Sequence, residues 1–197
     1  MLTVEQIQQH FIEMLNHAIR RPGMFGPGEI GLDHTLTDVV YVMETGDRRT
    51  WHAALEARGS WTSIGVSGWV MRLMPGTEQR AAASVYADYA HEHGWLALDR
   101  VLTSDEYGAM RDGFAEWCAV DRVREDVVAR FGEPSVRIGG SGDQVLGYGR
   151  PGEPIVWFHT GNDDVVLAGR CGGLFVESLR FTPEGERRRP VENDDEE

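Results

Sequence analysis

The stretch QVLGYGRPGEPIVWFHTGNDDVVLA, residues 144–168, decides the fold class. It contains three β-rich runs, at 144–148, 155–160 and 165–168. The turns between these runs, 150–153 and 161–164, are short and contain glycine. Such turns join antiparallel neighbours, because parallel strands need a crossover of a dozen residues or more. The stretch therefore predicts an antiparallel β-meander.

Similar runs on either side, Val136–Ile138 and Leu174–Phe181, extend the expected meander to four or five strands. The chain before Pro134 instead shows the spacing of amphipathic helices. Thr3 with Gln6, and Thr103 with Glu106, match the capping box that starts a helix. We expect five to seven helices, among them 4–20, 32–44, 50–58, 78–93, 104–118 and 123–131, and residues 66–74 form a further short apolar piece. The predicted fold class is α+β, with a helical N-terminal two-thirds followed by the meander.

The expected organisation has three segments. Residues 1–120 form a helical part, 121–183 a helix plus the meander, and 184–197 a disordered acidic tail. Because no Pro- or Ser-rich linker separates the first two, a single domain over 1–183 is the alternative. The helix near 122–131 is expected to cover one face of the sheet.

The composition argues against nucleic acid as a partner. The 197 residues include 32 acidic and 19 basic ones, all arginine, for a net charge of −13, whereas a nucleic-acid binder needs a positive surface. The first residues do not resemble a signal peptide, and no run of about 18 apolar residues predicts a membrane span. We therefore expect a soluble, cytoplasmic protein. Cys118 is expected to be a buried thiol.

Two short motifs suggest chemistry that their context does not support. Residues 147–152 match G-x-G-x-x-G, but a strand follows them, whereas a dinucleotide site needs a helix there. His91 and His93 point to different sides of a helix and cannot chelate one ion; we expect His93 in the core and His91 exposed. The sequence predicts no catalytic residue, metal or cofactor.

The segment Arg20-Arg21-Pro22-Gly23-Met24-Phe25 follows the first helix. It resembles the Arg-Pro-Gly-Met-Tyr segment that opens the ATP-binding domain of gyrase-B-type ATPases. The likeness spans about 25 positions, but no Asn follows Glu44 at the matching offset and the Asp-x-Gly-x-Gly loop is missing. ATP chemistry is therefore not expected. Arg20, Arg21, Met24 and Phe25 are candidates for a ligand or partner loop, and the alternative is a structural helix end.

Within the run 155–160, Trp157 and His159 lie on one face, because side chains alternate along a strand. If helices cover only the other face, both side chains are exposed beside an acidic turn, as in a recognition surface. The predicted partner-binding residues are then Trp157, His159, Asn162, Asp163 and Asp164. The alternative is that helices cover both faces, or that Trp157 packs on the N-terminal part.

The arginine-only, lysine-free composition and the order of helices before a meander resemble uncharacterised actinobacterial proteins of the immunity-protein type. This resemblance and the acidity imply a non-enzymatic interaction protein, such as an inhibitor that binds a basic protein toxin. Two alternatives stay open. One is an enzyme or small-ligand-binding protein with a site between the helical part and the sheet, involving Arg20, Arg21 and His159. The other is a structural or regulatory subunit.

Overall fold

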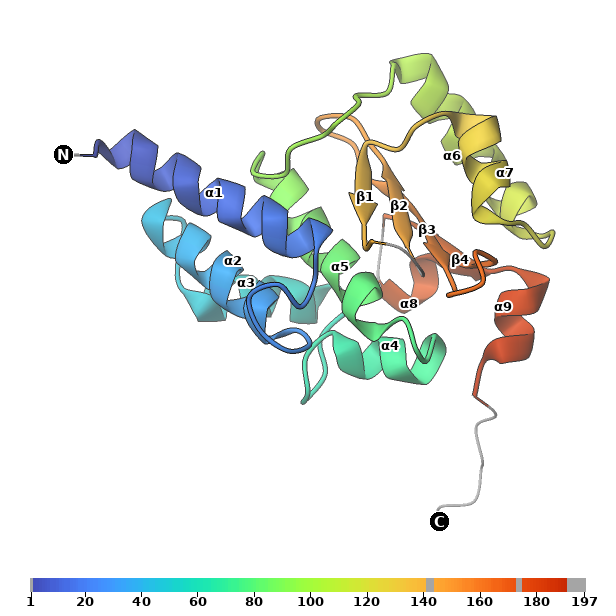
Figure 1. Cartoon of the computed structure of the whole chain (residues 1–197), viewed down its shortest axis with the longest axis horizontal. Coiled ribbons are helices and arrows are strands. Elements are labelled where there is room, and N and C mark those ends of the chain that lie inside the picture. Colours follow the sequence, from blue (N-terminus) through green and yellow to red (C-terminus); the bar gives the residue numbers. More distant parts are fainter. Residues whose placement is uncertain (1, 141–143, 173–174, 191–197) are drawn as a thin grey trace, which may run out of the picture.

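The computed structural model describes residues 2–140, 144–172 and 175–190, and the predicted α+β class is confirmed (Figure 1). The helices before the sheet are α1 (Val4–Arg20), α2 (Ile30–Val42), α3 (Arg48–Ala57), α4 (Ser67–Leu73), α5 (Glu78–Glu92), α6 (Ser104–Cys118) and α7 (Arg124–Phe131). The strands are β1 (Val136–Ile138), β2 (Val145–Tyr148), β3 (Val156–Thr160), β4 (Val166–Cys171) and β5 (Leu179–Phe181). The predicted capping boxes start α1 and α6.

The sheet is a five-stranded antiparallel meander in the order β1-β2-β3-β4-β5. Its register aligns Gly147 of β2 with Trp157 of β3, and Trp157 with Arg170 of β4. Aligned residues of neighbouring strands point to the same face. The Trp157 ring lies over Gly147, where a Cβ atom would come within 2.3 Å of it. The register thus places a large aromatic ring beside an arginine on one face of the sheet.

Helices cover both faces of the sheet (Figure 1). On one face, Ile155, Trp157 and Ala168 pack into a large buried cluster with residues of α1–α5. On the other, Val156 and Phe158 pack against residues of α6 and α7. The prediction that the helix near 122–131 covers one face is confirmed, and α6 lies in the same layer. The larger cluster joins side chains of the helical half and of the sheet.

The C-terminal part corrects two expectations. The run predicted as a strand at 174–181 contains the short helix α8 (Phe175–Ser178) before β5, while Leu174 lies outside the described residues. Residues predicted as part of a disordered tail form α9 (Pro183–Arg188), which Thr182 caps by accepting from Gly185 N at 3.1 Å. Residues 191–197 lie outside the described residues.

Helix α9 packs closely on β4. A Cβ atom at Gly185 would lie 1.8 Å from the carbonyl oxygen of Leu167, so only glycine fits there. Thr182 Oγ1 also donates to the carbonyl oxygen of Val166 at 2.7 Å. These contacts order the segment although its own apolar content is low. Within the described residues, no helix is long and apolar enough to cross a membrane.

Candidate functional site

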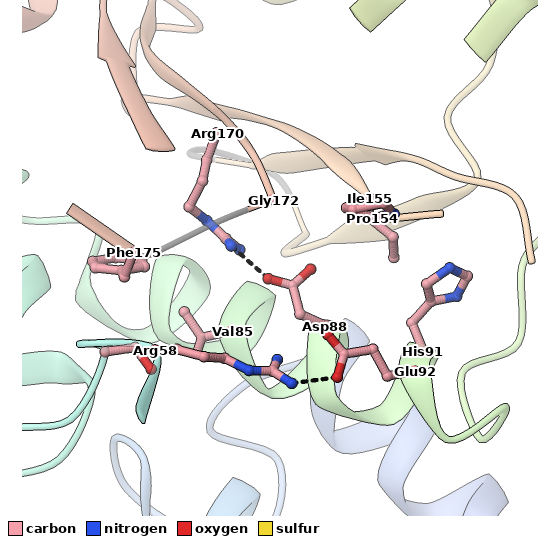
Figure 2. A pocket seen from close by; sticks show the side chains of 11 residues that line it. Arg58, Val85, Asp88, His91, Glu92, Pro154, Ile155, Arg170, Gly172 and Phe175 are labelled. Atoms are coloured by element: carbon pink, nitrogen blue, oxygen red, sulfur yellow. Dashed lines mark hydrogen bonds and ion pairs between the residues drawn. The ribbon is translucent and has the colours of Figure 1, made fainter. Parts of the chain in front are cut away.

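Helix α5 carries a polar stripe, although most of its residues are alanine or other buried side chains. Ser84, Asp88 and Glu92 follow one another at intervals of four residues. This spacing places them on one face, because four residues make about one helical turn. In Figure 2 this side of the helix faces the sheet, and Asp88 points toward Arg170. The stripe therefore brings two carboxylates to the junction between the helical half and the sheet.

Asp88 ties α5 to two strands. Its Oδ2 accepts from Nη1 of Arg170 at 2.5 Å, and its Oδ1 accepts from Nε1 of Trp157 at 2.7 Å. Nη2 of Arg170 also donates to Oγ of Ser84 at 3.1 Å. Arg170 is 4% exposed and lies 5.5 Å from the ring centroid of Phe175, which allows a cation–π contact. Removing one partner of such a pair would leave an uncompensated buried charge.

A second ion pair joins the stripe to the residue that follows α3. The guanidinium of Arg58 pairs with the carboxylate of Glu92 (Figure 2). The side chain of Arg58 is 28% exposed and that of Glu92 is 52% exposed, so water screens their attraction. Pairs of this kind contribute about 0–1 kcal/mol. Replacing Glu92 as the partner of Arg58 therefore costs less free energy than separating Asp88 from Arg170.

A cavity of about 240 Å³ lies between these two ion pairs, at the junction of α5 with the sheet. Figure 2 shows its walls, which combine the charged side chains with apolar ones. The apolar part consists of Val85, Pro154, Ile155 and Phe175. Several of the lining segments are far apart in the chain, so the cavity exists only in the folded protein.

His91 closes one side of the cavity. Its Nε2 lies 3.1 Å from the carbonyl oxygen of Arg150 and 3.0 Å from that of Glu153. A carbonyl oxygen only accepts, so Nε2 carries a proton. These bonds join α5 to the β2–β3 turn.

The structure corrects the prediction that Trp157 and His159 are exposed recognition residues. Both are 0% exposed, because the helical half covers their face of the sheet, as the alternative interpretation required. Trp157 is held by Asp88, whereas neither ring nitrogen of His159 has a hydrogen-bond partner among the described residues. Burial and, secondarily, the charge of Arg170 lower the pKa of His159 to about 3. The ring is therefore neutral at physiological pH.

The acidic turn between β3 and β4 lies at the surface, and its carboxylates have intramolecular partners. Asp163 accepts from Arg188 of α9 at 2.7 Å, and this hydrogen bond lowers the pKa of Asp163. Asp164 pairs with Arg124 at 3.0 Å. Asn162 is exposed. A partner-binding role for these three turn residues stays a prediction.

The loop after α1 lies away from the cavity. Arg20 pairs with Asp99 at 2.6 Å, and its carbonyl oxygen accepts from Gly139 N at 2.9 Å, so Arg20 joins α1 to the segment after β1. Arg21 is exposed, and Met24 and Phe25 are 57% and 41% exposed. Their role as a ligand or partner loop stays a prediction.

No group of three or more His, Cys, Asp or Glu side chains could hold a metal ion in the part of the chain that the structure describes. His93 was expected in the core but is exposed, stacked on Tyr89 and Trp95. Cys118 is buried as predicted, and burial raises its pKa to about 12. A thiol held in this form is a poor nucleophile, because the thiolate is the reactive species.

The polar residues at the cavity were not predicted as site residues from the sequence. The spacing of Ser84, Asp88 and Glu92 was an available signal, since a polar stripe on an alanine-rich helix marks a face with its own partners. Nothing local marked Arg58 or Arg170, which lie 34 and 82 positions from their carboxylate partners.

No known family matches this sequence, and no curated protein and no solved structure shows significant similarity to the chain.

Proposed function

We propose that this protein binds a small molecule in the cavity between α5 and the sheet. The observation that carries the proposal is the convergence of two arginines from distant segments, Arg58 and Arg170, on one cavity with apolar walls. Junctions between structural layers are common places for ligand sites. The site agrees in position with the ligand-binding alternative drawn from the sequence, but it uses other residues than Arg20, Arg21 and His159.

Binding without turnover fits the state of the polar groups. Both oxygens of Asp88 accept hydrogen bonds, and Nε2 of His91 donates to two carbonyl oxygens. A general acid or base must instead reach a proton of the substrate. Neither group is arranged for that role, so we propose a binding protein rather than an enzyme.

The test is a thermal-shift screen of metabolites, nucleotides and metal ions with the wild-type chain and two variants. Arg58→Gln removes a charge from the cavity. Arg49→Gln is the matched control, because Arg49 lies in α3, away from the cavity lining, and its side chain is 94% exposed. A ligand at a hundred times its Kd stabilises by about 2.7 kcal/mol. We expect a compound that raises the Tm of wild type and Arg49→Gln more than that of Arg58→Gln. Equal shifts in all three would contradict the proposal.

A second candidate function is an acidic interaction protein, such as an immunity-type inhibitor of a basic protein toxin. Its support is the distribution of charge in the folded part. Residues 1–57 and residues 104–133 each contain eight acidic side chains and four arginines. The acidic excess thus falls on α1–α3 and on α6–α7. Charge complementarity with a basic partner would accelerate association and make it sensitive to salt.

Affinity capture from the host lysate at low and moderate salt tests this candidate. We expect one stoichiometric basic protein that is retained less as salt rises. Charge reversal of Asp112 and Glu116 on α6, compared with Glu5 and Glu13 on α1, would identify the face that binds. An empty eluate at low salt would count against this function.

A further inference from the structure

The carboxylate of Asp88 at the cavity is held by two donors from the protein. Each oxygen of Asp88 already accepts one short hydrogen bond, from Trp157 and from Arg170. A cationic ligand at Asp88 would lie beside the guanidinium of Arg170, whose charge repels it. Displacing Arg170 would leave its charge buried without a counter-ion, which is strongly unfavourable.

The guanidinium of Arg170 still has N–H groups that make no hydrogen bond among the described residues. A guanidinium has five N–H groups, and Arg170 directs one to Asp88 and one to Ser84. Nη1 and Nη2 each carry one further N–H, and Arg170 lines the cavity. An arginine that lines a cavity with unused N–H groups favours a ligand that supplies an acceptor.

The Arg58–Glu92 pair points to the same ligand charge. If an anion replaced Glu92 on Arg58, the released carboxylate would be solvated, since its side chain is already 52% exposed. If a cation replaced Arg58 on Glu92, the less exposed guanidinium would lose its partner. The first exchange costs less free energy, so we expect an anionic ligand to replace Glu92 as the partner of Arg58.

Resting on the proposed function, we propose that the cavity binds a small monocarboxylate with an apolar body. Its carboxylate takes the place of Glu92 on Arg58 and lies within reach of Arg170. The planar, two-oxygen carboxylate matches the fork of a guanidinium. Its apolar body contacts Val85, Ile155 and Phe175, which line the cavity. The cavity, about 240 Å³, limits the ligand to a small molecule.

Three probes of nearly the same shape test the charge. Benzoate, benzamide and benzylamine are titrated into the ¹⁵N-labelled full chain, with the amide signals of residues 84–92, 155 and 156 as the readout. Benzoate is expected to bind at least about tenfold tighter than benzamide, because hydrogen bonds to charged groups are the stronger ones. Benzylamine is expected to leave these signals unchanged.

Two variants are expected to change benzoate affinity in opposite directions. Glu92→Gln frees Arg58 and tightens binding by up to about fivefold, the range of an exposed ion pair. Arg58→Gln weakens binding at least about tenfold. Glu116→Gln on α6 is the control for the change of net charge and leaves affinity as in wild type.

The outcomes separate this inference from the proposed function. Benzamide or benzylamine binding at these signals as tightly as benzoate would overturn the carboxylate assignment and still support a ligand site in the cavity. No response to benzoate, or an equal affinity in Arg58→Gln, would overturn the assignment as well. The proposed function would then depend on the thermal-shift comparison of Arg58→Gln with Arg49→Gln.

Discussion

Acidification is expected to destabilise the protein through His159. The ring is 0% exposed, and its neutral form is favoured by burial first and then by the positive charge of Arg170 on the neighbouring strand. Its pKa falls from 6.5 to about 3. Between these two values the unfolded chain binds a proton that the folded chain does not bind. Stability therefore falls as the pH falls below 6.5, and this contribution is constant above it.

The size of the effect follows from the width of this window. One pH unit within it changes the free energy of unfolding by about 1.4 kcal/mol. At about pH 4.5, two units below the ordinary pKa, His159 alone lowers the free energy of unfolding by about 2.7 kcal/mol. This is a large fraction of the stability of a typical domain, about 5–15 kcal/mol.

The assay is urea denaturation followed by tryptophan fluorescence, at about pH 7.5 and about pH 4.5. In His159→Leu the loss on acidification is expected to be smaller than in wild type by about 2.7 kcal/mol. The same substitution at exposed His34 controls for the loss of a histidine. Equal losses in wild type and His159→Leu would refute the reasoning, because the proton uptake would then belong to other groups.

Three further variants test the packing. Asp88→Asn leaves Arg170 buried without a counter-ion and is expected to lower the free energy of unfolding in urea by about 3–5 kcal/mol. Gly147→Ala places a Cβ atom 2.3 Å from the Trp157 ring and is expected to cost about 1–3 kcal/mol, with altered tryptophan emission. Truncation before Pro183 removes α9 from β4 and is expected to lower the free energy of unfolding by about 1–3 kcal/mol, whereas the loss of a disordered tail, as predicted for 184–197, would leave it unchanged.

Each of these three variants has a matched control. Asp99→Asn removes a carboxylate whose side chain is 61% exposed and is expected to cost less than about 1 kcal/mol. Gly113→Ala adds a methyl group on α6 where nothing lies within 4 Å. Glu186→Gln, which removes a carboxylate of α9 that is 54% exposed and pairs with Arg189, serves for the truncation. A variant that matched its control would count against the packing described around it.

The sequence predicted the elements whose cause is local. The capping boxes at Thr3 and Thr103 start helices because their side chains bind backbone groups three residues away. The glycine turns between β2, β3 and β4 set the meander in the same way. The helix α9 was missed because its order depends on contacts with β4 rather than on its own apolar content.

The candidate site could not be predicted to the same extent. Alternation placed Trp157 and His159 on one face correctly, but their exposure depended on which helices covered that face. The same packing brings Asp88 to Arg170 across 82 positions, a distance over which no local pattern carries information. Charged residues that meet in this way are recognised only when the docking of α5 is known.

The meander and the α5 junction have different consequences for folding kinetics. Neighbouring strands of the sheet are also neighbours in sequence, so each hairpin closes a short loop at little cost in entropy. Docking of α5 instead joins residues 69 and 82 positions apart and dehydrates Asp88 with Arg170. Contacts that form after the transition state mainly set the unfolding rate. If the Asp88–Arg170 pair forms after the transition state, it lowers the unfolding rate and has little influence on the folding rate.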